Sequence, residues 1–137
     1  MKNKNPIIVF TNGCFDILHI GHIRLLQKAK AEGDILIVGL NSDTSVRMIK
    51  GKNRPIIPEE QRAEMLKALE CVDHVVIFPE ISPLRLISRL RPDVLVKGED
   101  WKERDIIGRE LVKKIVRIPL EECMSTTDII EKIREEI

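Results

Sequence analysis

The chain has 137 residues, 43% hydrophobic and 3% aromatic, which is enough for one domain with an aliphatic core and too short for two ordinary domains. Its 23 Lys and Arg residues balance 22 Asp and Glu residues, so the net charge of +1 gives no electrostatic case for nucleic-acid binding. The polar start leaves no room for a signal peptide and no apolar run approaches membrane-spanning length, so we expect no membrane partner.

Apolar runs alternate along the chain with segments of helical periodicity, which is typical of a parallel α/β sheet. The expected strands are residues 7–10, 35–40, 74–78, 94–97 and 115–118. The expected helices are residues 20–32, a short helix after residue 43, and residues 58–69, 83–91, 106–113 and 127–136. Without repeats or linkers, we predict a single domain over residues 1–137, α/β and Rossmann-like, with about five parallel strands and helices on both faces.

The turn between the first strand and the first helix reads TNGCFDILHIGH over residues 11–22. If the helix begins near residue 20, His19 and His22 lean over the same helix end, where free N–H groups and the helix dipole favour phosphate. Gly21 lets a phosphate or base approach the backbone, and Gly13 gives the turn conformational freedom. This pattern predicts a triphosphate site. The alternative is a pair of solvated surface histidines.

Further polar residues follow the second strand, and ligands bind at the carboxyl ends of the strands in such sheets. Asn41 and Asp43 come first, and a helix cap is the alternative for this segment. A basic loop follows with Lys50, Lys52 and Arg54, which would clamp a phosphate-bearing substrate or simply be solvated surface. Arg62, in the next helix, either reaches into the site or forms an ion pair within its helix.

Polar residues also follow the fourth strand and precede the last helix. Lys97 supplies a cation, Gly98 permits a sharp turn, and Asp100 would accept hydrogen bonds from a ribose or base. For Trp101, the single tryptophan of the chain, the alternative to a role at the site is that it covers the edge of the core. The hydroxyl-rich segment 125–127 predicts a second anion cradle, with plain helix capping as the alternative.

The His19-Ile20-Gly21-His22 box in this turn resembles the nucleotidylyltransferase superfamily, whose members join a nucleotide to a phosphate ester and release pyrophosphate. Within it, the chain is most similar to the D-glycero-β-D-manno-heptose 1-phosphate adenylyltransferases. The similarity covers nearly the whole chain, including segments 10–19, 41–43, 50–55, 60–62, 68–73, 95–98 and 125–127. Glycerol-3-phosphate cytidylyltransferases share the histidines, Asp43, Arg62 and segment 98–101, whereas the acidic run before Ser125 is closer to the heptose enzymes.

The resemblance implies transfer of the adenylyl group of ATP to the heptose phosphate. The alternatives are CTP with glycerol 3-phosphate, and a nucleotide-binding module without catalysis. The residues expected to act in catalysis are His19, His22 and Lys50. Those expected to bind the nucleotide are Thr11, Asn12, Gly13, Phe15, Gly21, Gly98, Asp100, Ser125, Thr126 and Thr127. Those expected to bind the acceptor are Asp16, Asn41, Asp43, Lys52, Arg54, Arg62 and Lys97.

Mg²⁺ is expected to accompany the triphosphate, held mostly by phosphates and water, with Asp16 either facing its water shell or capping the turn. Cys14, Cys71 and Cys123 are widely spaced, show no metal-ligand spacing, and favour a reduced, cytoplasmic protein. We expect a homo-oligomer, most simply a dimer. The length also favours a stand-alone form of a domain that many bacteria fuse to a sugar kinase.

Overall fold

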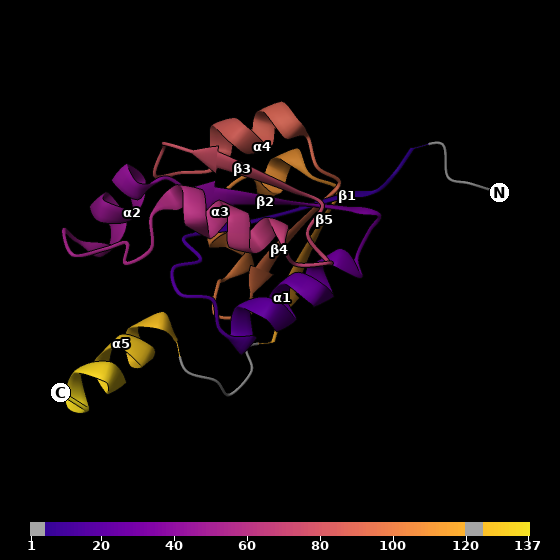
Figure 1. The fold of residues 1–137 in the computed structure, drawn as a ribbon. Coiled ribbons are helices and arrows are strands. Elements are labelled where there is room, and N and C mark those ends of the chain that lie inside the picture. The colour runs from indigo at the N-terminus through magenta and orange to yellow at the C-terminus, as the bar shows by residue number, and fades with distance from the viewer. Residues whose placement is uncertain (1–4, 120–124) are drawn as a thin grey trace.

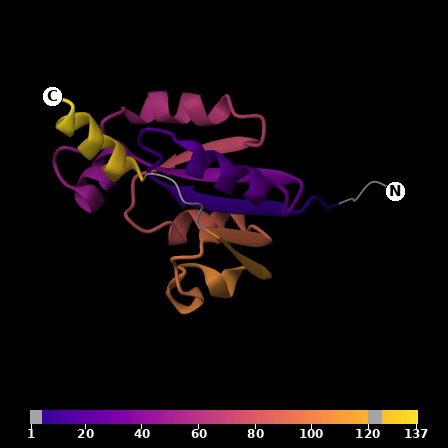
Figure 2. The ribbon, with the colours of Figure 1, turned by 90° about the horizontal axis from the view of Figure 1, so that it is seen from below.

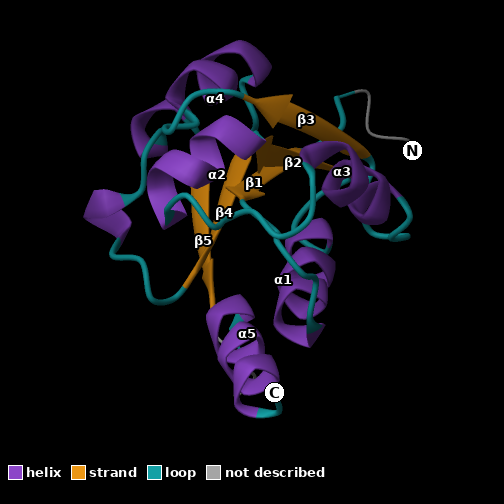
Figure 3. Cartoon of the chain, turned by 60° about the vertical axis from the view of Figure 1, so that its left-hand side comes forward, coloured by secondary structure: helices purple, strands orange, loops and turns teal. Residues whose placement is uncertain are grey.

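A five-stranded parallel sheet forms the centre of the molecule. The computed structural model describes residues 5–119 and 125–137. Its strands are β1 (Ile8–Gly13), β2 (Ile35–Asn41), β3 (His74–Phe78), β4 (Val94–Gly98) and β5 (Lys114–Ile118). The strand order is β3-β2-β1-β4-β5, and every neighbouring pair is parallel (Figure 3). The predicted Rossmann-like α/β sheet is confirmed.

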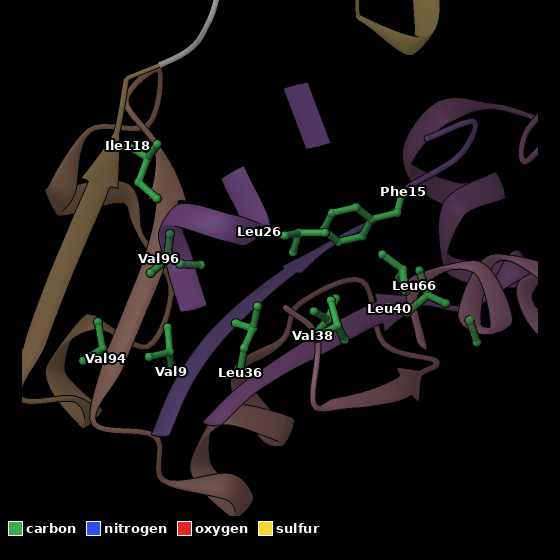
Figure 4. Close-up of a cluster of buried hydrophobic side chains, with 13 residues drawn as sticks. Val9, Phe15, Leu26, Leu36, Val38, Leu40, Leu66, Val94, Val96 and Ile118 are labelled. Carbon is green, nitrogen blue, oxygen red and sulfur yellow. The ribbon is translucent and has the colours of Figure 1, made fainter. Parts of the chain in front are cut away.

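Helices cover both faces of this sheet. The α-helices are α1 (Ile20–Lys30), α2 (Asp43–Lys50), α3 (Glu59–Lys67), α4 (Leu84–Leu90) and α5 (Thr126–Glu135). Leu26 of α1 and Leu66 of α3 pack with Val38 and Val96 in one apolar cluster (Figure 4). Ile87 of α4 packs in a second cluster with residues of β1, β2 and β4. In the described part of the chain, no helix is long and apolar enough to cross a membrane.

The predicted helix over residues 106–113 is wrong. Two short 3-10 helices, Glu103–Asp105 and Arg109–Leu111, occupy this part of the chain instead. Gly108 adopts a left-handed φ of 89°, and a Cβ at this position would lie 2.8 Å from Ile87 Cδ1. A continuous α-helix cannot pass through that conformation, so the segment turns over Ile87. The helices predicted to begin at Pro58 and Pro83 begin one residue later, with each proline at the N-cap.

The strand order reverses between β1 and β4, and the two strands separate at their carboxyl ends. Their pairing covers Val9 with Val94 and Phe10 with Leu95, although both strands continue beyond it. The Thr11 hydroxyl donates to the carbonyl of Val96 at 2.9 Å across the widening gap. A crevice at such a switch point is where α/β sheets bind ligands. Helices α2 and α5 lie at this end, opposite the start of β1 (Figures 1 and 2).

Candidate functional site

A cavity of about 700 Å³ opens at the carboxyl ends of the strands. The turn after β1, the start of α1, the loops after β3 and β4, and the start of α5 all contribute to its wall. Most of the residues predicted from the sequence line it: Asn12, Gly13, Phe15, Asp16, His19, Gly21, His22, Asn41, Lys50, Arg54, Lys97, Ser125, Thr126 and Thr127. Segments far apart in the sequence therefore meet around one space of ligand size.

The turn between β1 and α1, here called the signature turn (residues 14–19), takes a conformation that the sequence did not indicate. Phe15 and Ile17 have left-handed φ values of 47° and 56°, which bulky residues rarely adopt. Gly13 has no such φ, so the expectation that it supplies backbone freedom is wrong. A Cβ at Gly13 would lie 3.0 Å from Phe15 Cε2, so a side chain here would make a tight contact with the buried Phe15 ring. Figure 4 shows this ring within the apolar cluster.

The two histidines cap the N-terminus of α1 reciprocally. The N–H of Gly21 donates to His19 Nδ1 at 3.1 Å, and the N–H of His19 donates to His22 Nδ1 at 3.3 Å. Their rings stack with centroids 3.8 Å apart. Because each Nδ1 accepts a hydrogen bond, the proton of each neutral ring resides on Nε2. Both side chains line the cavity, so the sequence prediction that they share one helix end is confirmed.

Burial holds both imidazoles in the neutral form. It lowers the pKa of His22 to about 4, and the neighbouring His19 lowers it further in the same direction. Burial also lowers the pKa of His19. Near neutral pH the pair therefore offers two Nε2–H donors without carrying charge of its own. Such donors hydrogen-bond phosphate oxygens.

Asp16 connects the signature turn to the basic loop (residues 50–55). Its carboxylate accepts from Arg54 Nε at 2.9 Å and from the N–H groups of Ile56 and Ile57 at 2.8 and 3.0 Å. Both carboxylate oxygens are therefore used by the protein, which disfavours the expected role at a metal's water shell. Of the three basic residues in the loop, Lys50 and Arg54 line the cavity and Lys52 does not.

The buried side chain of Arg62 links several segments near the carboxyl ends of the strands. Its guanidinium donates to the carbonyls of Ile57, Cys14 and Asn41 at 2.7–2.9 Å and pairs with Asp43 Oδ1 at 2.7 Å. The side chain is 1% exposed and lies outside the cavity wall. Its observed partners give it a structural role. The alternatives expected from the sequence were only a place in the site or an ion pair within its own helix.

Lys97, near the end of β4, lines the cavity and is partly buried. Burial lowers the pKa of Lys97 to about 8, against the opposing effects of Asp100 and Cys14. Its Nζ lies 5.1 Å from the centroid of the Trp101 ring, which also lines the cavity. Burial raises the pKa of the Cys14 thiol, although nearby cations, Lys50 first, oppose the shift. Lys97 is placed to attract an anionic ligand.

The start of α5 approaches the signature turn from the far end of the sequence. Ser125 caps the helix by accepting from the N–H of Asp128 at 3.1 Å. Thr126 Oγ1 donates to the carbonyl of Asp16 at 2.7 Å. The predicted helix cap is therefore present, and it faces the same cavity as the histidines. The acidic run of residues 120–124 lies outside the described residues.

Six predicted residues do not line the cavity: Thr11, Asp43, Lys52, Arg62, Gly98 and Asp100. The Thr11 hydroxyl is taken by the sheet, and the Asp43 carboxylate by Arg62. The sequence analysis missed the loop after β3 and the side of α1, which contribute Arg24, Lys28, Ile81, Ser82 and Pro83. The rule that ligands bind at the carboxyl ends of parallel strands could have identified the loop. Arg24 and Lys28 are four residues apart and therefore lie on one face of α1, which could have identified them.

Known proteins match this architecture. The family model described as cytidylyltransferase-like matches residues 10–132. The chain is 57% identical over 135 residues to the bifunctional protein HldE of Campylobacter jejuni subsp. doylei, and 58% identical over 134 residues to that of Helicobacter pylori strain J99. Each alignment covers 98% of this chain and 29% of the relative, so the chain spans under a third of these proteins.

Solved structures show the same fold. The lipopolysaccharide core biosynthesis protein from Thermoplasma volcanium superposes with a TM-score of 0.75 at 31% identity, covering 86% of this chain and all of that one. A pantoate-beta-alanine ligase from Francisella tularensis, at 22% identity with a TM-score of 0.59, shares the fold over 99% of this chain and 72% of its own. The chain belongs to the cytidylyltransferase-like family and is a nucleotidyltransferase.

Proposed function

We propose that this chain transfers the adenylyl group of ATP to D-glycero-β-D-manno-heptose 1-phosphate, giving ADP-heptose and pyrophosphate for lipopolysaccharide-type heptose biosynthesis. The likeness to the bifunctional HldE proteins, which extends over nearly the whole chain, is the observation that carries the proposal. The likeness to a lipopolysaccharide core biosynthesis protein also supports a role in heptose biosynthesis.

In the proposed reaction, an oxygen of the acceptor phosphate attacks the α-phosphorus of ATP and forms a new P–O–P bridge. The bond from the α-phosphorus to the oxygen shared with the β-phosphate breaks, and its electron pair leaves with pyrophosphate. A phosphate monoester has a second pKa of about 6, so the acceptor is already ionised near neutral pH and needs no general base. Catalysis then consists of in-line positioning and charge stabilisation.

The cavity supplies groups for each part of this reaction. The Nε2–H groups of His19 and His22 would donate to the phosphates around the α-phosphorus, where charge develops in the transition state. The start of α5, with Ser125 and its neighbours, would hold the β- and γ-phosphates through free N–H groups and hydroxyls. Lys50 and Arg54 would hold the acceptor phosphate.

Mg²⁺ is proposed to arrive with the triphosphate. No three His, Cys, Asp or Glu side chains gather as a metal site within residues 5–119 and 125–137. Both oxygens of Asp16 accept N–H groups. The chain's donor set thus fits an ion held by phosphate oxygens and water, where it would neutralise triphosphate charge.

A second candidate, the formation of CDP-glycerol from CTP and glycerol 3-phosphate, is favoured by segment 98–101, which resembles that of the cytidylyltransferases. A two-by-two assay of ATP or CTP with each acceptor, followed by pyrophosphate release, separates the candidates. We expect turnover with ATP and the heptose phosphate. Robust CDP-glycerol formation without ADP-heptose would overturn the choice of substrates. Tight ATP binding without pyrophosphate from any pair would indicate a nucleotide-binding module.

We also propose that the chain acts as a homo-oligomer in the cytoplasm. Large apolar side chains such as Met48, Leu84 and Ile133 are exposed in the single chain and would suit an interface. The free thiols of Cys14 and Cys71 suit a reducing compartment. Light scattering that gives the mass of one chain at working concentration would contradict the oligomer.

A further inference from the structure

The Asp16 carboxylate lies beside the cavity, accepts three hydrogen bonds and is almost completely shielded from solvent. Its side chain is 1% exposed. One oxygen accepts from Arg54 Nε and from the N–H of Ile56, and the other accepts from the N–H of Ile57. These partners lie 38 to 41 residues further along the chain. The carboxylate therefore fixes the end of the basic loop against the signature turn.

The hydrogen bond to Asp16 uses Nε of Arg54, a residue that lines the cavity, and leaves its two terminal nitrogens available to a ligand. Only Nε of its guanidinium contacts Asp16, and within the described parts of the chain neither terminal nitrogen has a hydrogen-bond partner. The Arg54 side chain is 14% exposed and lines the cavity. A guanidinium held through Nε keeps its two terminal nitrogens as a planar fork, which matches two oxygens of a phosphate monoester.

The backbone around Asp16 is equally constrained. The residues on either side, Phe15 and Ile17, both have left-handed φ values, a strained arrangement that persists where surrounding contacts enforce it. The Asp16 carbonyl accepts from Thr126 Oγ1 at 2.7 Å, so the same residue also anchors the start of α5. Asp16 thus links the basic loop, which carries Lys50 and Arg54, to the start of α5, which faces the cavity.

We propose that Asp16 is a positioning residue for the acceptor: it binds no substrate, but it holds the Arg54 fork at the phosphate monoester that attacks the nucleotide. The identity of that acceptor rests on the proposed function. The role differs from the three sequence expectations for Asp16, namely direct binding of the acceptor, contact with a metal's water shell and simple capping of the turn.

Steady-state kinetics of Asp16→Asn, Arg54→Met and the double variant test this role. We expect each single variant to raise the KM for the acceptor about ten- to a hundredfold, the range for loss of a charged hydrogen bond, with the KM for the nucleotide changed less than about twofold. Because Asp16 acts through Arg54, the double variant should be no worse than Arg54→Met. Asp93→Asn is the matched control, since Asp93 also binds a backbone N–H and a lysine but lies outside the cavity.

Equal rises in both KM values, or an Asp16→Asn effect that persists in full on the Arg54→Met background, would overturn the proposal. If Asp16→Asn does not fold by circular dichroism, Asp16→Glu takes its place, because it keeps the charge and displaces the carboxylate by one methylene. An unchanged acceptor KM in folded Asp16→Glu would also overturn it.

Failure of the proposed function gives a different result. If the wild-type chain turns over none of the four substrate pairs, heptose 1-phosphate and glycerol 3-phosphate are each titrated calorimetrically into protein saturated with α,β-methylene-ATP. The Asp16 role then predicts that Asp16→Asn weakens the binding of whichever acceptor binds, as much as Arg54→Met does. Wild-type affinity in Asp16→Asn, or no binding of either acceptor to the wild-type chain, would refute the role.

Discussion

Replacement of Arg62 by methionine separates a structural role from a substrate-binding role. The methionine fills part of the space of the buried side chain but provides no donor. It leaves three backbone carbonyls, those of Cys14, Asn41 and Ile57, without the guanidinium that they now share. It also leaves Asp43 without its cation.

The expected loss of stability follows from these contacts. Removing one partner of a buried ion pair destabilises a protein by about 3–5 kcal/mol. Asp43 is 30% exposed, so water solvates its carboxylate and the lower end, about 3 kcal/mol, applies. For 137 residues with an unfolding entropy of about 2.1 cal/mol/K each, this lowers Tm by about 10 °C.

Thermal unfolding by circular dichroism measures this loss, and Arg47→Met, at an exposed position on α2, is the control that should unfold within about two degrees of wild type. Activity is then measured well below the lower Tm. If Arg62→Met unfolds at the wild-type temperature but loses acceptor affinity, the structural account is wrong and Arg62 contacts substrate.

Three further predictions concern the cavity cations and histidines. His22→Ala should lower kcat at least about a hundredfold, the effect of losing one preorganised donor. It should cost about 1 kcal/mol of stability through the lost cap, and near-normal turnover would contradict the donor role. Because His22 has a pKa of about 4 when folded against 6.5 ordinarily, the unfolded state binds that proton first, so stability should fall as pH drops from about 6.5 to 4. His22→Gln should flatten this part of the pH profile in urea unfolding, and an unchanged slope would contradict it. Lys97, with a pKa of about 8, should lose its charge as pH rises, so kcat/KM should fall above pH 8 and Lys97→Arg should remove that fall; a wild-type profile that is flat to pH 9.5 would contradict it.

The elements of the fold were predictable because their signals are local. The apolar runs of the five strands and the helical spacing after them are contained within each segment. The strand order, and with it the position of the switch point, came only from the structure. The failed helix at residues 106–113 shows the limit. The apolar spacing there fits a helix, but Gly108 takes its left-handed conformation against Ile87, a contact between segments that periodicity does not contain.

Some residues of the candidate site were likewise predictable from local sequence patterns, and others depend on contacts in the folded chain. His19, His22 and the start of α5 were identified because helix capping and phosphate binding have short sequence patterns. The partners of the Asp16 carboxylate and the Arg62 guanidinium lie up to 48 residues away along the chain. The residue type alone does not distinguish a buried side chain that links segments from one that binds substrate. Burial and hydrogen-bond geometry make that distinction, and both depend on the folded chain.

The most direct test of adenylyl transfer follows oxygen from the acceptor. The heptose 1-phosphate is labelled with ¹⁸O in its three non-bridging phosphate oxygens, incubated with ATP, Mg²⁺ and the protein, and the products are analysed by mass spectrometry and ³¹P NMR. Attack by the acceptor on the α-phosphorus predicts that all three labels appear in ADP-heptose, one of them in the bridge between its phosphorus atoms, and that pyrophosphate is unlabelled. Unlabelled ADP-heptose, or AMP in place of released pyrophosphate, would contradict adenylyl transfer to the sugar phosphate.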